Sequence, residues 1–113
     1  MTIKRSFPET LTNKQLYNLT MSPETQKMTS AKGSTLEIAG WCCYEDVDKE
    51  GELRTILCLQ TPEGELFATN SATFQDDFFR MVELFGGTVT AIDIISGTSK
   101  AGREFITCAY AGE

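Results

Sequence analysis

One helical stripe, set between short strand-like segments, constrains the fold of this chain more than any other feature. The large apolar residues between positions 71 and 87 recur at helical spacing: Phe74, Phe78, Met81, Val82 and Phe85. Such a stripe is typical of a helix that buries one face. Ser71 or Thr73 can cap its start, and Gly86 with Gly87 can end it. We therefore expect one amphipathic α-helix with its phenylalanine face in the core.

The segments around this helix have the pattern of strands. Three precede it, at residues 35–44, 53–60 and 65–69, and two follow it, at residues 89–95 and 103–110. Each alternates in polarity or is apolar throughout over a strand-like length. Gly40 interrupts the first one, and a glycine inside a strand commonly marks a bulge or bend. The sequence therefore predicts a mainly β protein.

The order strand, strand, strand, helix, strand, strand is that of the OB-fold. That fold is a five-stranded antiparallel Greek-key β-barrel, here with one helix between strands 3 and 4. A bend at Gly40 would let the first strand pair with two neighbours as the barrel closes. A length of 113 residues suits one such core. A mixed α+β sandwich with the same element order is the alternative fold.

The N-terminal third differs from the rest in charge. Residues 1–33 carry a net charge of +3, whereas residues 34–113 carry −9, within a total of −6. Residues 1–11 show no period and predict a loose leader. Thr12 and Gln15 have the spacing of a capping box, which favours a short helix, although an extended segment also fits. We expect a basic N-terminal arm (1–33) and an OB-fold-like domain (34–113), a combination that suits a nucleic acid but also describes many solvated tails.

Composition argues against metal sites and catalysis. The chain has no histidine, and its four cysteines contain no C-x-x-C, so the common zinc frameworks are excluded. An EF-hand-like start at Asp46 has Leu57 where calcium binding needs a bidentate glutamate. Without histidine, a serine or cysteine nucleophile lacks its usual base. We expect no cofactor, no enzyme activity, and cysteines that serve as small buried apolar residues.

A polar loop before the last strand carries two cations, Lys100 and Arg103. In OB-folds, the loops joining strands 1–2 and 4–5 flank the oligonucleotide- or oligosaccharide-binding face. The 4–5 loop here is Ser96 to Gly102, whereas the 1–2 loop is acidic and would repel phosphates. Phosphate contacts are therefore expected from Lys100, Arg103, Arg54 and the N-terminal arm. The alternative is a solvated hairpin turn.

Three stretches of the chain resemble one protein family. They are Thr55-Ile-Leu, Glu63-Gly-Glu-Leu-Phe-Ala, and Ile95-Ser-Gly-Thr-Ser-Lys-Ala-Gly followed by Phe105. In order and spacing they are similar to the small single-stranded DNA-binding proteins of bacteriophages of Gram-positive bacteria, including those with protein-primed replication. The resemblance implies binding of single-stranded DNA without sequence preference, protecting displaced strands during phage DNA replication. It also allows replication proteins as partners. With no signal peptide or membrane-length apolar run in the sequence, we expect the host cell cytoplasm.

The resemblance also implies that Tyr44 and Phe67 stack on bases. A family aromatic in the loop between strands 1 and 2 has no counterpart here, and Trp41 could compensate or could fill the barrel. Strand parity leaves open whether Phe67 or its neighbour faces the core, and the same holds for Phe105. Tyr44, at a strand end with a polar hydroxyl, is the ring expected to be exposed.

A second function fits the acidic body. The loop between strands 1 and 2 holds Glu45, Asp46, Asp48, Glu50 and Glu52. An acidic phage-encoded protein could bind a host protein, as an inhibitor or by imitating the charge of DNA. The two functions differ in whether single-stranded oligonucleotides or a host protein are bound.

Overall fold

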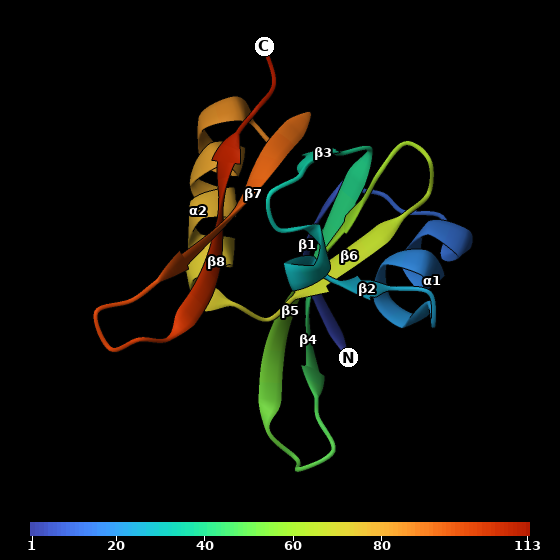
Figure 1. Ribbon diagram of the computed structural model, residues 1–113. Coiled ribbons are helices and arrows are strands. Elements are labelled where there is room, and N and C mark those ends of the chain that lie inside the picture. Colours follow the sequence, from blue (N-terminus) through green and yellow to red (C-terminus); the bar gives the residue numbers. More distant parts are fainter.

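Eight strands and two α-helices make up the computed structural model, which describes residues 1–113 (Figure 1). The elements are β1 (Thr2–Phe7), α1 (Asn13–Met21), β2 (Gln26–Lys27), the 3-10 helix η1 (Met28–Ala31), β3 (Thr35–Glu37), β4 (Gly40–Val47), β5 (Leu53–Gln60), β6 (Leu66–Thr69), α2 (Ala72–Phe85), β7 (Ala91–Thr98) and β8 (Glu104–Tyr110). The protein is therefore mainly β, as predicted. No helix has the length and apolar character that crossing a membrane requires.

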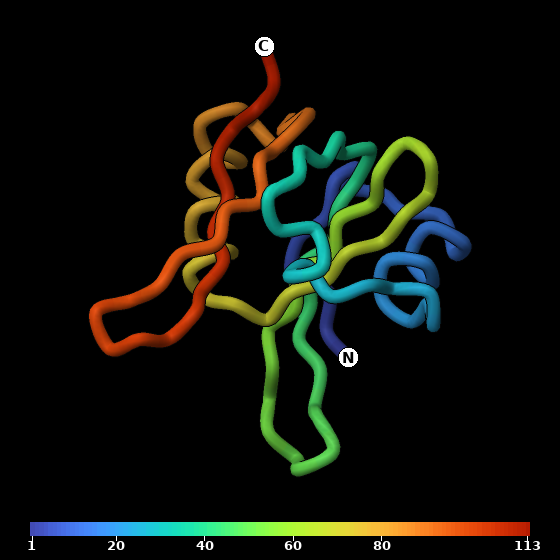
Figure 2. The backbone as a smooth tube through the Cα atoms, viewed as in Figure 1, coloured from blue at the N-terminus to red at the C-terminus, as the bar shows by residue number.

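The strands form two sheets. The larger has the order β1-β4-β5-β6-β2, and the smaller has the order β3-β7-β8. All pairs are antiparallel except β2 with β6. The larger sheet lies between α1 on one side and β7, β8 and α2 on the other, and the tube in Figure 2 shows the path of the chain between these layers.

The predicted bend at Gly40 is present and connects the two sheets. β3 pairs with β7, whereas β4, which begins at Gly40, pairs with β5. A Cβ atom on Gly40 would lie 2.9 Å from the carbonyl oxygen of Phe7. Only glycine therefore allows β1 to approach β4 this closely.

The sheets do not join into the closed five-stranded barrel that we expected. β6 pairs with β2 and not with β8. The edge of β8 is covered by α2 instead: the Thr107 hydroxyl donates to Asp77, and the Cys108 thiol donates to the Phe74 carbonyl at 3.8 Å. Because adjacent strand residues point to opposite faces, contacts from both place the helix along the strand edge.

The predicted helix is α2, with the predicted ends. The Ser71 side chain accepts from the Phe74 amide, and Gly86 ends the helix with a left-handed φ of 69°. Phe74, Phe78 and Val82 are fully buried in the main core, as the stripe predicts, and Met81 packs against it. The last member of the stripe, Phe85, instead lies at the surface against Tyr110, with ring centroids 4.6 Å apart.

The prediction of a loose leader is wrong for residues 2–7. They form β1, which pairs with β4 from Thr2 opposite Glu45 to Phe7 opposite Trp41. The capping box of α1 is confirmed, because the Gln15 amide donates to the Thr12 hydroxyl and the Thr12 amide donates to the Gln15 side chain.

Much of the N-terminal third is packed on the larger sheet. Leu19 of α1 joins a small cluster on the outer face of that sheet; its other members are Cys42, Tyr44, Cys58 and Leu66. Met28 and Ala31 of η1 belong to the main core on the opposite face. Residues from the N-terminal third therefore cover both faces of the sheet.

All four cysteines are free and buried, in agreement with the sequence. Burial raises the pKa of the Cys58 and Cys108 thiols to about 12, and that of Cys42 to about 11, from 9.0. A thiol with a raised pKa keeps its proton in the native state when the unfolded chain has already lost it. The resulting stabilisation is complete below pH 9 and is lost as the pH rises towards these values.

We therefore expect the free energy of unfolding to decrease as the pH rises above about 9, because the buried thiols resist losing their protons in the folded state. Urea unfolding followed by circular dichroism at a series of pH values measures this change. For each protein, the decrease is the difference between its free energy of unfolding near neutral pH and at high pH. This decrease should be smaller in Cys58→Ala than in the natural protein. The same decrease in both proteins would show that this thiol is not responsible.

Candidate nucleic-acid interface

Two hairpins extend from the body of the protein (Figure 1). The β4–β5 hairpin pairs as far as Val47 opposite Leu53, and the β7–β8 hairpin as far as Thr98 opposite Glu104. Ser96, Gly97 and Thr98 thus belong to β7, and the turn that carries Lys100 is shorter than predicted. Lys100 and Arg103 are exposed at this turn, where the Ser99 amide donates to the Arg103 carbonyl at 2.8 Å.

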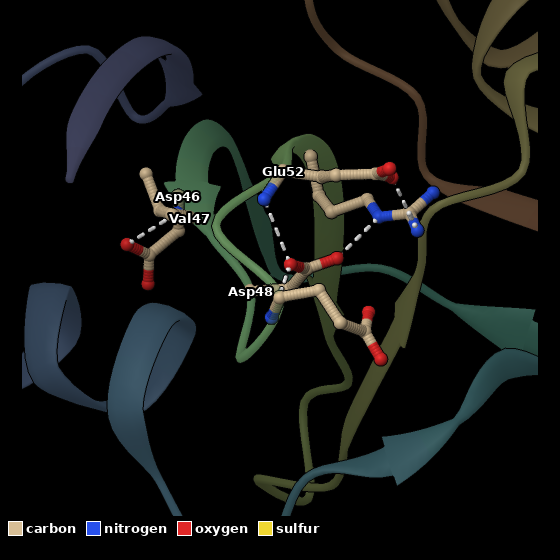
Figure 3. Close-up of polar contacts among 6 residues, drawn as sticks. Asp46, Val47, Asp48 and Glu52 are labelled. Carbon is tan, nitrogen blue, oxygen red and sulfur yellow. Dashed lines mark hydrogen bonds and ion pairs between the residues drawn. The ribbon is translucent and has the colours of Figure 1, made fainter.

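The acidic hairpin is stabilised by its own charges (Figure 3). The Asp48 carboxylate accepts from the amides of Glu50 and Glu52 and, at 2.9 Å, from Nε of Arg54. Nη2 of Arg54 donates to Glu52 at 3.2 Å. The hydrogen bond from Arg54 holds the pKa of Asp48 below its usual value. Two carboxylates pair with Arg54, so its charge is less available to a phosphate than we expected.

Three of the predicted stacking residues are buried. Trp41 is 2% exposed in the main core, where its indole N–H donates to the Gly87 carbonyl. Phe67 is 5% exposed in the same core. Tyr44, which we expected at the surface, is 6% exposed beneath α1, and its hydroxyl donates to the Thr20 carbonyl at 3.3 Å. None of these rings offers a face to a base in this conformation.

Phe105 is the exposed ring among the predicted stacking residues. Its side chain is 39% exposed and lies across the strand pair over Gly97, its partner on β7. A Cβ atom on Gly97 would lie 2.6 Å from the tip of the ring. The glycine therefore provides the space in which this ring lies.

A groove that the sequence did not reveal passes close to this ring. Two hollows of about 290 and 440 Å³ adjoin, because Thr29, Thr69 and Asn70 line both. We call them together the lysine groove. Its lining residues are Lys27, Met28, Thr29, Lys32, Ile56, Ala68, Thr69, Asn70, Ser71, Ser96, Glu104, Phe105 and Ile106.

Backbone pairing brings the two lysines of this groove close to the sheets. Lys27 ends β2, which pairs with β6, and Lys32 follows η1. The Gly33 amide then donates to the Ile94 carbonyl at 2.8 Å, which ties this segment to β7. The only sequence signal for these lysines was the excess of basic residues in the N-terminal third.

The cations in and near the groove are free. Among the ten basic side chains, only Lys4 and Arg54 form ion pairs. Lys27 and Lys32 are exposed, and Glu104 is the one acidic residue in the lining. The lysine groove therefore has two ammonium groups without ion pairs, and Phe105, whose exposed ring lies over Gly97, is among its lining residues.

The largest hollow lies elsewhere and has mixed charge. It measures about 580 Å³, between β1 and the end of α2. Lys4 and Arg5 line it together with Glu9 and Glu83. Lys4 pairs with Glu45 at 3.7 Å, and Arg5 lies over the Phe79 ring at 5.0 Å. Opposite charges side by side give this hollow no preference for an anion.

Comparison with protein-family models, curated proteins and solved structures finds no match to this chain.

We expect Gly97→Ala to push the Phe105 ring out of its position, because the new methyl group would overlap the ring. Any stacking of a base on this ring should weaken severalfold, as base–aromatic stacking contributes about 1–3 kcal/mol. Anisotropy titration of a labelled oligo-dT measures the effect, with Phe105→Ala as the reference. Thr98→Ala, one residue away on the same strand, is the control. Unchanged affinity in both Gly97→Ala and Phe105→Ala would exclude this ring from the interface.

Proposed function

We propose that this protein binds single-stranded DNA without sequence preference, with the lysine groove as its main contact surface. The observation that carries the proposal is the combination of an exposed Phe105 ring with the unpaired Lys27 and Lys32. Lysines can neutralise backbone phosphates, and a ring can stack on any base because every base has a π-face. The role implied by the family resemblance is protection of displaced strands during phage DNA replication, in the host cell cytoplasm and beside replication proteins.

The arrangement of strands supports an opened relative of the OB-fold as part of this proposal. The bent β3–β4 segment pairs with both β5 and β7, as the first strand of an OB-fold does with its neighbours. The β4–β5 and β7–β8 hairpins then correspond to the loops that flank the OB binding face. In this description, α2 and β2 occupy the two edges that would otherwise pair to close the barrel.

The features of the groove favour single strands over duplex. Stacking on Phe105 needs an unstacked base, which a duplex does not offer. The net charge of −6 opposes indiscriminate binding of polyanions. Attraction therefore has to come from local cations, and affinity should fall steeply as salt rises.

The acidic hairpin supports the second candidate, binding of a host protein. Val47 and Leu53 are cross-strand partners that are 58% and 63% exposed among the acidic residues at the end of this hairpin. Apolar side chains within a negative surface suit a protein partner with a basic, partly apolar surface. Co-purification of such a partner without any oligonucleotide binding would favour this function over the first.

A gel-shift titration with matched single- and double-stranded oligonucleotides tests the main proposal. We expect retardation of the single strand at about 20 mM salt and a progressive loss of binding at higher salt. Tryptophan quenching is a poor readout because Trp41 is buried. The proposal fails when the single strand is not retarded at low salt, or when duplex binds equally well.

We expect Lys100→Gln with Arg103→Gln to weaken oligo-dT binding severalfold and to flatten its salt dependence. Both side chains are exposed beyond the end of the groove and form no ion pair, so they can reach phosphates there. Circular dichroism should show an unchanged fold. Normal binding by this double variant would make the β7–β8 turn a structural connection only.

A further inference from the structure

We infer that α1 is a displaceable cover, and that the outer face of β4, β5 and β6 beneath it is a second contact surface for longer single strands. This inference rests on the proposed function and extends it from the open groove to a surface that is buried in the free protein.

The lysine groove continues to the edge of the surface that α1 covers. Ile56 and Ala68 line the groove, and both also pack against the cluster that holds Leu19 of α1. Lys27 lines the same end of the groove. A strand that extends past this end of the groove would therefore meet α1 on the outer face of the sheet.

Few contacts hold α1 on the sheet. Leu19 is its only fully buried side chain, in a cluster of five buried residues separate from the main core. The one side-chain hydrogen bond between α1 and the sheet joins the Tyr44 hydroxyl to the Thr20 carbonyl at 3.3 Å. No ion pair joins the two. A helix of nine residues is only marginally stable without packing, so docking and helix formation of α1 depend on each other, and weakening the helix should favour the undocked state.

The covered surface has the chemistry that an unstacked base prefers. Tyr44 supplies an aromatic ring, and Cys42, Cys58 and Leu66 surround it with apolar surface. Lys27 lies at the adjoining end of the groove, where it can hold a phosphate. A longer strand can thus replace the α1 contacts with stacking and apolar contacts of its own. Continuity with the groove favours nucleic acid as the occupant over a protein segment.

The test uses the full chain with oligo-dT of about 6 and about 20 nucleotides, the first within and the second beyond the length that a single OB-type site covers. Thr12→Ala removes the capping box of α1 without changing the covered face. We expect it to bind the long oligonucleotide about fivefold tighter, the factor that corresponds to a typical lost cap. Affinity for the short one should be unchanged. Thr73→Ala, at an exposed position on α2, is the matched control.

Cysteine alkylation followed by peptide mass spectrometry reports the opening directly. Cys42 and Cys58 lie in the cluster beneath α1, whereas Cys43 and Cys108 lie in the main core and are internal references. Thr12→Ala, and more strongly Leu19→Ala, should speed alkylation of Cys42 and Cys58 relative to the references. The long oligonucleotide should slow it again in both variants.

Two results would overturn the inference. In one, Cys42 and Cys58 become no more reactive than the references in either variant, so that α1 does not undock. In the other, both react faster, but the long oligonucleotide neither protects them nor binds more tightly. Either result with normal binding of the short oligonucleotide leaves the proposed function intact. Loss of binding to both lengths in the natural protein defeats the proposed function itself.

Discussion

Replacing Trp41 with alanine is expected to lower the free energy of unfolding by about 3–5 kcal/mol. Trp41 is almost fully buried, and its ring meets Phe78 and Phe79 edge-on at centroid distances of 5.5 and 5.6 Å. Alanine would leave a cavity where β4 packs against α2 and would remove the donor to the Gly87 carbonyl. A loss of this size is a large fraction of the stability of a small domain. Urea unfolding followed by circular dichroism measures it.

Trp41→Phe separates packing from binding. Phenylalanine keeps most of the apolar contact, so the loss of stability should be smaller than for alanine, and the folded variant should bind oligo-dT as the natural protein does. The core-packing role of Trp41 would be contradicted if Trp41→Ala unfolded at the same urea midpoint as the natural protein but no longer bound the oligonucleotide. That result would make Trp41 a stacking residue after all.

Replacing Lys27 and Lys32 with glutamine is expected to weaken oligo-dT binding about tenfold or more at low salt. Both lysines line the groove, and neither forms an ion pair. Each phosphate contact on a single strand contributes about 0.7 to the slope of log affinity against log salt, so the slope should decrease by about 1.4. Anisotropy titrations of labelled oligo-dT between about 20 and 200 mM salt measure both quantities.

A double variant of equal charge separates the groove from net charge. Lys14→Gln with Lys49→Gln removes two charges, one on α1 and one on the turn of the acidic hairpin. Its effect on affinity and slope should be clearly smaller than that of the groove variant. Equal losses in the two variants would mean that overall charge, and not the lysine groove, governs binding.

Local patterns account for the elements that were predicted correctly. The stripe from Phe74 to Val82 and the caps Ser71 and Gly86 are all read within one or two helical turns. The bend at Gly40 and the alternating strands are likewise local. Such signals depend on the backbone preferences of neighbouring residues, and these are present before the chain is folded.

Long-range packing explains what was predicted wrongly. An alternating strand shows that one of its faces is buried, but it does not show whether another element covers the opposite face. Leu66 and Phe67 were expected to divide between core and solvent, yet both are buried because α1 covers the outer face. Residues 2–7, which show no period, became an edge strand because β4 offered free backbone groups to pair with.

By itself, the sequence determined the mainly β character, the ends of α2, the bend at Gly40 and the unequal charge of the two parts of the chain. Tertiary structure decided which aromatic rings are accessible, that Arg54 is held by Asp48 and Glu52, and that Lys27 and Lys32 lie in one groove with Phe105. The physical reason is how far apart in the sequence the interacting residues lie. Helix caps and strand alternation act between residues a few positions apart, whereas burial and grooves arise from contacts between segments that are distant in the chain.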